Sequence, residues 1–232
     1  MTIPTRVAPQ LTTEGDVAVI TMDDGKVNVF SHPSLEALHA GLDAAQGQAN
    51  ALVLAGRPGK FSAGFDLAVM AGSPQDQQAL VRAGADFLMR LYGYGMPVVA
   101  ACTGHALAAG AISLLACDLR IGPESSTAKI GMNEVNIGMV IPRFGLELAR
   151  DRLSKRHLTA ATVLGRIYNP QDAVDAGYLD LLVPEDEVVR TAIAHATELA
   201  ANTRNGAVAG TKTKLRDQMI ALVNAGLDED IS

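Results

Sequence analysis

Short apolar runs separate longer stretches of helical periodicity along most of the chain. Five runs, at residues 16–22, 51–55, 98–102, 118–122 and 179–183, have the length and composition of buried β-strands. Between them, apolar residues recur every three or four positions, as in a helix that buries one face. Because strands and helices alternate up to about residue 184 and only helical patterns follow, the sequence predicts an α/β body with a helical C-terminal section.

Turn residues divide this pattern. Ser73 with Pro74, and Asn169 with Pro170, place a capping side chain before a proline, which is typical of a helix N-terminus. Residues 56–64 contain three glycines and a proline and are predicted to form a loop. Residues 104–110 are predicted to form a Gly/Ala turn before a buried helix. We expect a core domain over residues 1–168 and a mainly helical oligomerisation segment over residues 169–232.

The composition narrows the possible partners. The 232 residues carry a net charge of −6 without a run of basic residues, which argues against nucleic acid as the main partner. Polar residues interrupt the longest apolar stretch, and residues 1–10 lack the apolar segment of a signal peptide, so we expect a cytoplasmic protein without membrane contact. Cys102 and Cys117 lie in apolar runs without metal-ligand spacing and are expected to be buried free thiols. No metal site is predicted.

Three common motifs fail at specific residues. Gly93 and Gly95 resemble the start of a dinucleotide-binding loop, but Met and Pro follow them where a helix should begin. The loop over residues 56–60 is too short for a phosphate-binding loop, and Phe61 stands where a magnesium-binding Ser or Thr is needed. Ser62 is not in a nucleophile elbow, because that turn requires glycine two residues before the serine.

Three segments together carry the candidate chemistry. They are F-S-A-G-F-D-L at residues 61–67, G-H-A-L-A-A-G-A at residues 104–111, and K-I-G-M-N-E-V-N-I-G at residues 129–138. In this order they resemble the two oxyanion-hole motifs and the acid/base motif of the crotonase (enoyl-CoA hydratase/isomerase) family. Residues 169–184 resemble the part of that family that follows the catalytic region, so the resemblance covers about residues 15–190.

The resemblance implies a crotonase fold, in which repeated ββα turns form a spiral core and the C-terminal helices build homotrimers, often paired into hexamers. It also implies a fatty-acyl-CoA thioester as substrate, with coenzyme A as part of that substrate and no separate cofactor. Two backbone N–H groups would stabilise negative charge on the thioester oxygen, each contributing about 3 kcal/mol.

By the same resemblance, the two donors are the N–H groups of Phe65 and Ala109. Family members usually have glycine at the second position, so the Ala109 methyl is expected to narrow the pocket. Gly64 permits a turn that side chains forbid, and residues 68–79 and 139–148 are expected to set the pocket depth. The other residues expected to meet the substrate are Val27, Ala63, Asp66, Leu67, Ala108, Gly110 and Ile112.

Glu134 is the candidate catalytic base, since its apolar neighbours in sequence would raise the pKa of its carboxyl. Ile112 stands where hydratases of the family carry a second glutamate. Adding water needs two polar groups, whereas moving a double bond needs one base that takes a proton from C2 and returns it at C4. The leading hypothesis is therefore an enoyl-CoA isomerase, with a hydratase or another crotonase reaction as one alternative and a non-catalytic acyl-CoA-binding protein as another.

Simpler explanations exist for the same residues. The glycines could serve only tight turns, and Glu134 could be a surface carboxylate. Asp66 is expected to cap a helix or orient its loop rather than react, and His105 and Asn28 are expected to be structural. The occurrence of all three motifs in one chain favours the site over these alternatives.

Overall fold

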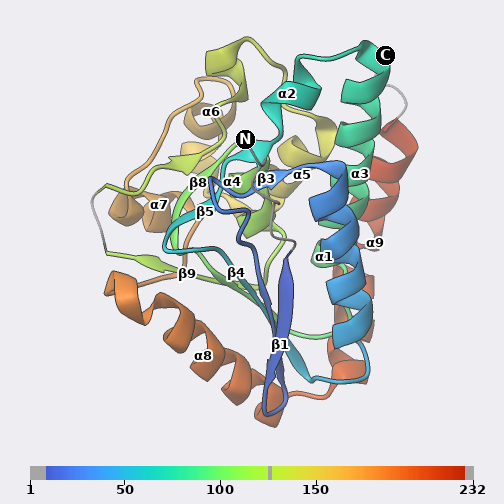
Figure 1. Cartoon of the computed structure of the whole chain (residues 1–232), viewed down its shortest axis with the longest axis vertical. Helices are drawn as coiled ribbons and strands as arrows, with labels where there is room; N and C mark the ends of the chain where they lie inside the picture. Colours follow the sequence, from blue (N-terminus) through green and yellow to red (C-terminus); the bar gives the residue numbers. More distant parts are fainter. Residues whose placement is uncertain (1–8, 125–126, 228–232) are drawn as a thin grey trace, which may run out of the picture.

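The main sheet of the computed structural model, which describes residues 9–124 and 127–227, has the strand order β1-β2-β4-β7-β9-β11. β1 runs antiparallel to β2, and all other neighbours in this sheet are parallel. The strands are β1 (Gln10–Glu14), β2 (Val17–Thr21), β4 (Ala51–Ala55), β7 (Val98–Ala101), β9 (Leu119–Pro123) and β11 (Leu181–Val183). Figure 1 shows the sheet between α8 (Val188–Asn202) and the other helices.

Helices cover both faces of this sheet, which explains why its strands are continuous apolar runs. Val17 and Val19 of β2 pack toward α8, whereas Ala18 and Ile20 point to the opposite side. There they join the larger core with α1 (His32–Ala45), α3 (Pro74–Tyr92) and α4 (Ala109–Leu115).

The chain repeats a ββα turn in which one strand joins the main sheet and the next joins a smaller sheet. The smaller sheet has the order β10-β8-β5, all parallel, with β5 (Gly59–Ser62), β8 (Gly104–Leu107) and β10 (Ile130–Gly131). The helices that complete the three turns are α3, α4 and α5 (Arg143–Arg152). The predicted α/β class and ββα spiral are confirmed.

The helix starts agree with the predicted caps. The hydroxyl of Ser73 accepts the N–H of Asp76 at 3.2 Å at the start of α3. The side-chain oxygen of Asn169 accepts the N–H of Asp172 at 2.8 Å at the start of α7 (Pro170–Ala176). Each side chain satisfies a backbone donor that the first helical turn leaves unpaired.

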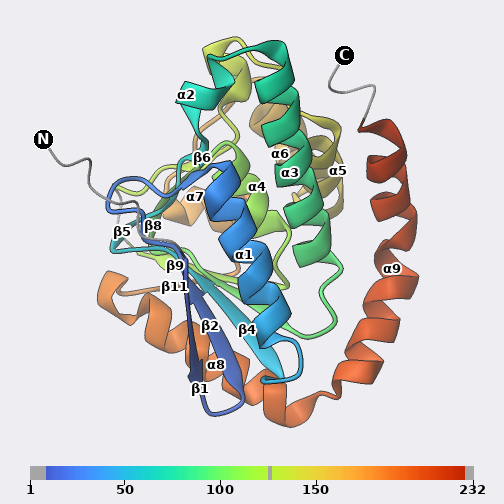
Figure 2. The same cartoon turned by 45° about the vertical axis from the view of Figure 1, so that its right-hand side comes forward.

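Beyond residue 184 the chain is helical, as predicted. A short 3-10 helix, η2 (Glu185–Glu187), leads into α8, and α9 (Asn205–Gly226) follows. In Figure 2, α9 rises along the side of the molecule next to α5 and α3. β11 lies beyond the proposed boundary at residue 168 and pairs with β9, so the segment after that residue also contributes to the main sheet. The division of roles at residue 168 stays a prediction.

Two predicted connections were wrong. Residues 56–64 contain β5 and the start of β6 (Gly64–Phe65), which pairs with β3 (Val29–Phe30), and α2 (Leu67–Met70) follows. Residues 104–110 contain β8 and the first turn of α4 rather than a simple turn. Glycine is needed in β8 because a side chain on Gly104 would collide with the backbone of Gly59 at 2.1 Å. The predictions for residues 1–8 fall outside the described residues.

Candidate active site

A mainly apolar cavity of about 230 Å³ lies at the N-terminal end of α4. Its walls come from all three motif segments, from α3 and from the chain around α5. The lining residues are Ala63, Phe65, Leu67, Met70, Val81, Leu107, Ala108, Ile112, Asn133, Glu134, Ile137, Met139, Pro142 and Phe144. The fold therefore brings together residues that are as much as 81 positions apart in the chain, from Ala63 to Phe144 (144 − 63).

Glu134 is the titratable residue of this lining. It opens the 3-10 helix η1 (Glu134–Ile137) and is only 6% exposed. Burial raises the pKa of its carboxyl to about 7, opposed by a hydrogen bond from its own backbone. Its Oε2 atom is buried and accepts no hydrogen bond. An acid with this pKa exchanges protons readily near neutral pH.

The Phe65 and Ala109 amides lie close to one another. Successive residues of a strand point their backbone N–H groups to opposite sides. The Asp66 N–H donates to the Phe30 carbonyl of β3 at 3.0 Å, so the N–H of the preceding Phe65 points away from β3. Ala109 is the first residue of α4, where backbone N–H groups have no partner within the helix. A methyl group built on Gly64, which precedes Phe65, would lie 3.0 Å from the Ala109 nitrogen. The two amides thus lie beside one cavity, as an oxyanion hole requires.

Glycine is required at two positions of this arrangement. Gly64 has a φ of +86°, and a side chain there would also press on the backbone of Leu107 and Ala109. A side chain on Gly110 would meet the Ser62 carbonyl oxygen at 2.3 Å. Ala108 has a φ of +51° and a ψ of −129°, a sparsely populated conformation for a residue with a side chain that costs about 1–3 kcal/mol. This local strain directs the chain from β8 into α4 at the cavity.

Ile112 forms an apolar wall of the cavity. It is fully buried, and a methyl group built on Gly145 of α5 would lie 2.8 Å from its Cδ1 atom. The close approach of α5 leaves no space between the helices for a larger group. The cavity therefore presents a hydrocarbon side chain at the position where the resemblance places a second acid in hydratases.

Four of the other residues predicted to contact the substrate either line the cavity or pack directly behind its lining. Ala63, Leu67 and Ala108 line the cavity, and Gly110 packs beneath it against Ser62. Asp66 caps α2 by accepting the Ala68 N–H at 3.0 Å, so it orients the loop as expected.

Val27 lies apart from the cavity lining. Its side chain is exposed, and its carbonyl accepts the Ala63 N–H at 3.0 Å. The neighbouring Asn28 is buried and donates its side-chain amide to the carbonyls of Met22, Lys60 and Phe61, which confirms a structural role. His105 accepts the Lys129 N–H at 3.0 Å, which joins β8 to the chain before β10.

Some lining residues were not predicted individually. Met70, Met139, Pro142 and Phe144 fall within the two ranges that were expected to set the pocket depth. Val81, Leu107 and Ile137 were missed because an apolar residue in a helix or strand carries no signal that distinguishes a cavity wall from a packed core. Asn133 also lines the cavity, and its position next to Glu134 was the signal that could have identified it.

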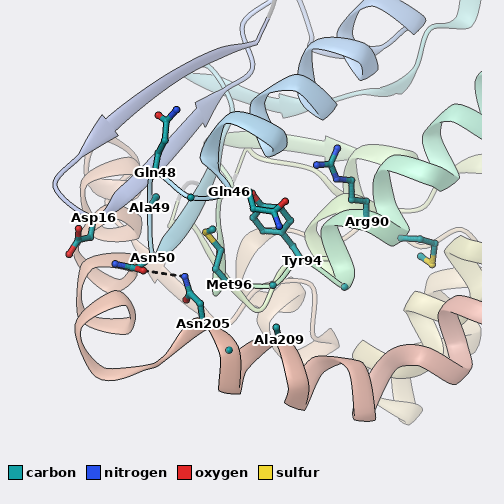
Figure 3. A pocket seen from close by; sticks show the side chains of 15 residues that line it. Asp16, Gln46, Gln48, Ala49, Asn50, Arg90, Tyr94, Met96, Asn205 and Ala209 are labelled. Carbon is teal, nitrogen blue, oxygen red and sulfur yellow. Dashed lines mark hydrogen bonds between the residues drawn. The ribbon is translucent and has the colours of Figure 1, made fainter.

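A larger hollow of about 840 Å³ lies at the opposite end of the fold, between the N-terminus of α9 and the ends of α1 and α3 (Figure 3). Its lining is rich in side-chain amides, and Asn205 donates to the Asn50 side chain at 3.2 Å. Arg90 at its edge is already paired with Asp43 and His39. None of the predicted site residues lines this hollow, and its size alone gives it no chemistry.

The described residues contain neither a cluster of metal ligands nor a helix that could span a membrane. Across residues 9–124 and 127–227, no three His, Cys, Asp or Glu side chains gather closely enough to hold a metal ion. Every helix in these ranges is too short or too polar to cross a lipid bilayer. Cys102 and Cys117 are buried free thiols, as predicted, and burial raises the pKa of each to about 12.

Comparison with known proteins agrees with this geometry. Residues 12–228 match the model of the enoyl-CoA hydratase/isomerase family. Human mitochondrial enoyl-CoA delta isomerase 1 is 31% identical over 181 residues, which cover 76% of this chain and 60% of the human protein. A putative enoyl-CoA hydratase of Thermus thermophilus is 31% identical over 228 residues, covering 93% of this chain and 85% of that protein.

Solved structures give the same result. The structure of a Mycobacterium tuberculosis enoyl-CoA isomerase superposes with a TM-score of 0.90 at 37% identity, covering 95% of this chain and 96% of that one. An enoyl-CoA hydratase/isomerase family protein of Pseudomonas syringae has a TM-score of 0.93 at 34% identity and covers 96% of each chain. With its family match, its ββα spiral and its three motifs around one cavity, this chain belongs to the crotonase, or enoyl-CoA hydratase/isomerase, family.

Proposed function

We propose that this protein is an enoyl-CoA isomerase that moves a double bond from C3=C4 to C2=C3 of a fatty-acyl-CoA thioester. Glu134 takes a proton from C2, and the electron pair of that C–H bond passes through C1 to the carbonyl oxygen. The N–H groups of Phe65 and Ala109 stabilise the resulting negative charge. When the carbonyl re-forms, a double bond forms between C2 and C3, the C3=C4 electrons move to C4, and Glu134 returns the proton there.

The observation that carries this proposal is that the described lining of the cavity has one acid, Glu134, and an apolar residue, Ile112, where a second acid would be needed for hydration. Glu134 is the acid of the lining, with Oε2 unpaired and a pKa raised to about 7, and Ile112 lies where the family resemblance places a second acid. One carboxyl can carry a proton between two carbons of the same substrate. The remaining apolar walls suit an acyl chain, because they exclude water from the enolate.

A hydratase is the second candidate. The relatives include a Thermus thermophilus protein described as a putative enoyl-CoA hydratase. Hydration requires that a water molecule be held and deprotonated as it attacks C3, while C2 gains a proton. Asn133 is the polar neighbour of Glu134 in the cavity and could hold such a water, although it cannot deprotonate it. A non-catalytic acyl-CoA-binding role is the third candidate.

Three assays separate these candidates. We expect 3-enoyl-CoA to be converted to 2-enoyl-CoA, and 2-enoyl-CoA to gain no water at a comparable rate. Incubation of an acyl-CoA in deuterated water should exchange the C2 hydrogen for deuterium. Rapid formation of 3-hydroxyacyl-CoA would support the hydratase instead, and binding without any C2 exchange would support the non-catalytic role.

The protein's setting is also proposed. No separate cofactor is required, since coenzyme A arrives with the substrate. We propose a cytoplasmic location and a homotrimer or hexamer. Support for assembly comes from four large exposed apolar side chains, with Val140 at 86%; Ile137 lines the cavity, and Val140 and Val163 line an open hollow that shares Met139 with it. These four are Ile137, Val140, Val163 and Leu164. Sedimentation of the purified protein would test the assembly.

A further inference from the structure

Four buried polar atoms without hydrogen-bond partners gather around the segment that carries Glu134. Within the described part of the chain, they are Asn133 Oδ1, Glu134 Oε2, Tyr168 Oη and Tyr178 Oη. The other buried side-chain atoms of this kind are the Nε atoms of three arginines whose terminal nitrogens do make hydrogen bonds. An unpaired buried polar group costs about 1–3 kcal/mol, so a concentration of them calls for a physical explanation.

The two tyrosines lie behind the catalytic segment. Tyr168 exchanges two backbone hydrogen bonds with Ile130 of β10, at 3.0 and 2.8 Å, and this strand leads directly to Glu134. Tyr178 follows the last turn of α7, is fully buried, and packs its ring 5.7 Å from that of Tyr168. Tyr178 does not line the cavity, so it approaches the segment from the protein interior.

The unpaired groups of Tyr178 and Glu134 are complementary. The backbone N–H of Met132 lies near the phenol oxygen of Tyr178 without forming a full hydrogen bond, and the hydroxyl hydrogen of Tyr178 has no acceptor among the described residues. Glu134 Oε2 is an acceptor without a donor, two residues further along the chain. Burial raises the pKa of the Tyr178 hydroxyl, and Tyr168 and the nearby Glu134 carboxylate raise it further.

We propose that Tyr178 is a positioning residue, whose hydroxyl donates through one buried water to Glu134 Oε2 and so orients the carboxylate toward the cavity. A polar cluster with unsatisfied donors and acceptors is the kind of place where proteins hold an internal water. The inference deepens the proposed function, because a proton shuttle between C2 and C4 requires a carboxyl held in one orientation. The hydrogen bond itself does not depend on which reaction is catalysed.

The charged surroundings distinguish the two tyrosines. Tyr168 and Glu134 are the titratable groups that act on Tyr178. Tyr168 instead faces Arg166, whose guanidinium lies 4.8 Å from the ring centre, the carboxylate of Asp172, and the His157 ring at 5.8 Å. Tyr168 therefore serves as a matched control: it has the same chemistry and an equally unpaired hydroxyl, but it is not coupled to Glu134.

The first test is a titration of Glu134 that requires no turnover. The carboxyl band of Glu134 is followed by infrared difference spectroscopy against pH and assigned by its loss in Glu134→Gln. A donated hydrogen bond favours the ionised carboxylate, so Tyr178→Phe should move the midpoint up by about one pH unit. Tyr168→Phe should leave it in place. An unchanged or lowered midpoint in Tyr178→Phe overturns the proposal.

A second measurement keeps the native side chain. The sequence contains four tyrosines, so protein labelled at the tyrosine ζ carbon gives four carbon resonances that Tyr→Phe variants can assign. The Tyr178 resonance should shift with pH at the midpoint of Glu134, and this shift should vanish in Glu134→Gln. A Tyr178 signal that ignores the Glu134 ionisation overturns the proposal even if Tyr178→Phe does not fold. If both titrations succeed while the enoyl-CoA assays fail, the proposed reaction is wrong and the hydrogen bond stands.

Discussion

Two acidic residues of this molecule illustrate opposite uses of a carboxyl group. Asp118, between α4 and β9, accepts the Val98 N–H at 2.7 Å, Lys212 Nζ at 2.6 Å and Arg216 at 2.9 Å. Glu134 is more deeply buried, yet its Oε2 accepts nothing. The difference lies in the supply of donors: three groups donate to the Asp118 carboxylate, whereas one oxygen of Glu134 receives no hydrogen bond from any described residue.

The surroundings of each acid extend this contrast. Around Asp118, Lys212 also donates to the carbonyls of Tyr94 and Met96, and Arg216 stacks on Tyr92 with its Cζ 4.3 Å from the ring centre. These bonds attach α9 to the core. Around the cavity, the Phe65 N–H points away from β3, the Ala109 N–H has no partner within α4, and Glu134 Oε2 has no hydrogen-bond partner in the described part of the chain. The paired polar groups around Asp118 stabilise the fold, whereas the unpaired polar groups at the cavity are available to bind and react with a substrate.

The largest expected effect is on activity. Glu134→Gln keeps the shape of the side chain but removes the base, so turnover of 3-enoyl-CoA should fall by about 10²–10⁴-fold. The circular dichroism spectrum should remain that of the native protein. Turnover near that of the native protein would show that Glu134 is not the base.

Asp118→Ala should produce the reverse outcome. It leaves Lys212 and Arg216 without their carboxylate, and breaking a buried ion pair destabilises by about 3–5 kcal/mol. Denaturant unfolding should report this loss, while activity per folded molecule is retained because Asp118 is remote from the cavity lining. A fully stable Asp118→Ala protein would contradict the role assigned to this cluster.

The next effect concerns pH. Since the folded-state pKa of Glu134 is raised from 4.5 to about 7, its protonated form is favoured in the folded protein. This contribution to stability is complete below pH 4.5 and is lost as pH rises through 7, by about 3 kcal/mol in all. Activity should change in the opposite direction, rising about tenfold per pH unit up to pH 7 and then levelling off.

The control for this prediction is again Glu134→Gln. The variant cannot ionise at this position, so its stability should vary less between pH 5 and pH 8 than that of the native protein. At pH 8 it should be the more stable of the two in a denaturant titration. Equal pH dependence in the two proteins would mean that Glu134 titrates normally.

The smallest expected effect is on the backbone beside the oxyanion amides. Gly64→Ala and Gly59→Ala both force a side chain into the left-handed region, at φ of +86° and +75°, and this strain should cost each about 1–2 kcal/mol of stability, with a further loss in Gly64→Ala from crowding. Only the Gly64 methyl would meet Ala109, at 3.0 Å from its nitrogen, whereas that of Gly59 enters open space. Activity should therefore fall at least tenfold further in Gly64→Ala. Equal activity in both variants would contradict the proposed role of these amides.

Much of the fold could be predicted from the chain alone. The strand at Ala51–Ala55 and the caps at Ser73 and Asn169 were located correctly, because apolar run length and capping chemistry are local properties. The edge strand β1 was missed, since it is exposed and carries threonine and glutamate rather than an apolar run. β5, β6 and β8 were missed because their glycines, which elsewhere mark turns, here allow backbones to pack closely.

The residues of the candidate site were named from the sequence, but their relation was not. The chain itself determined the alternation of buried strands and helices, the acid at position 134 and the apolar residue at position 112. Only the tertiary structure decided that the Phe65 and Ala109 amides lie together, that Glu134 is deprived of donors, and that Tyr178 lies behind it. The physical reason is that desolvation and hydrogen-bond supply depend on neighbours distant in sequence, whereas periodicity and capping depend on residues a few positions away.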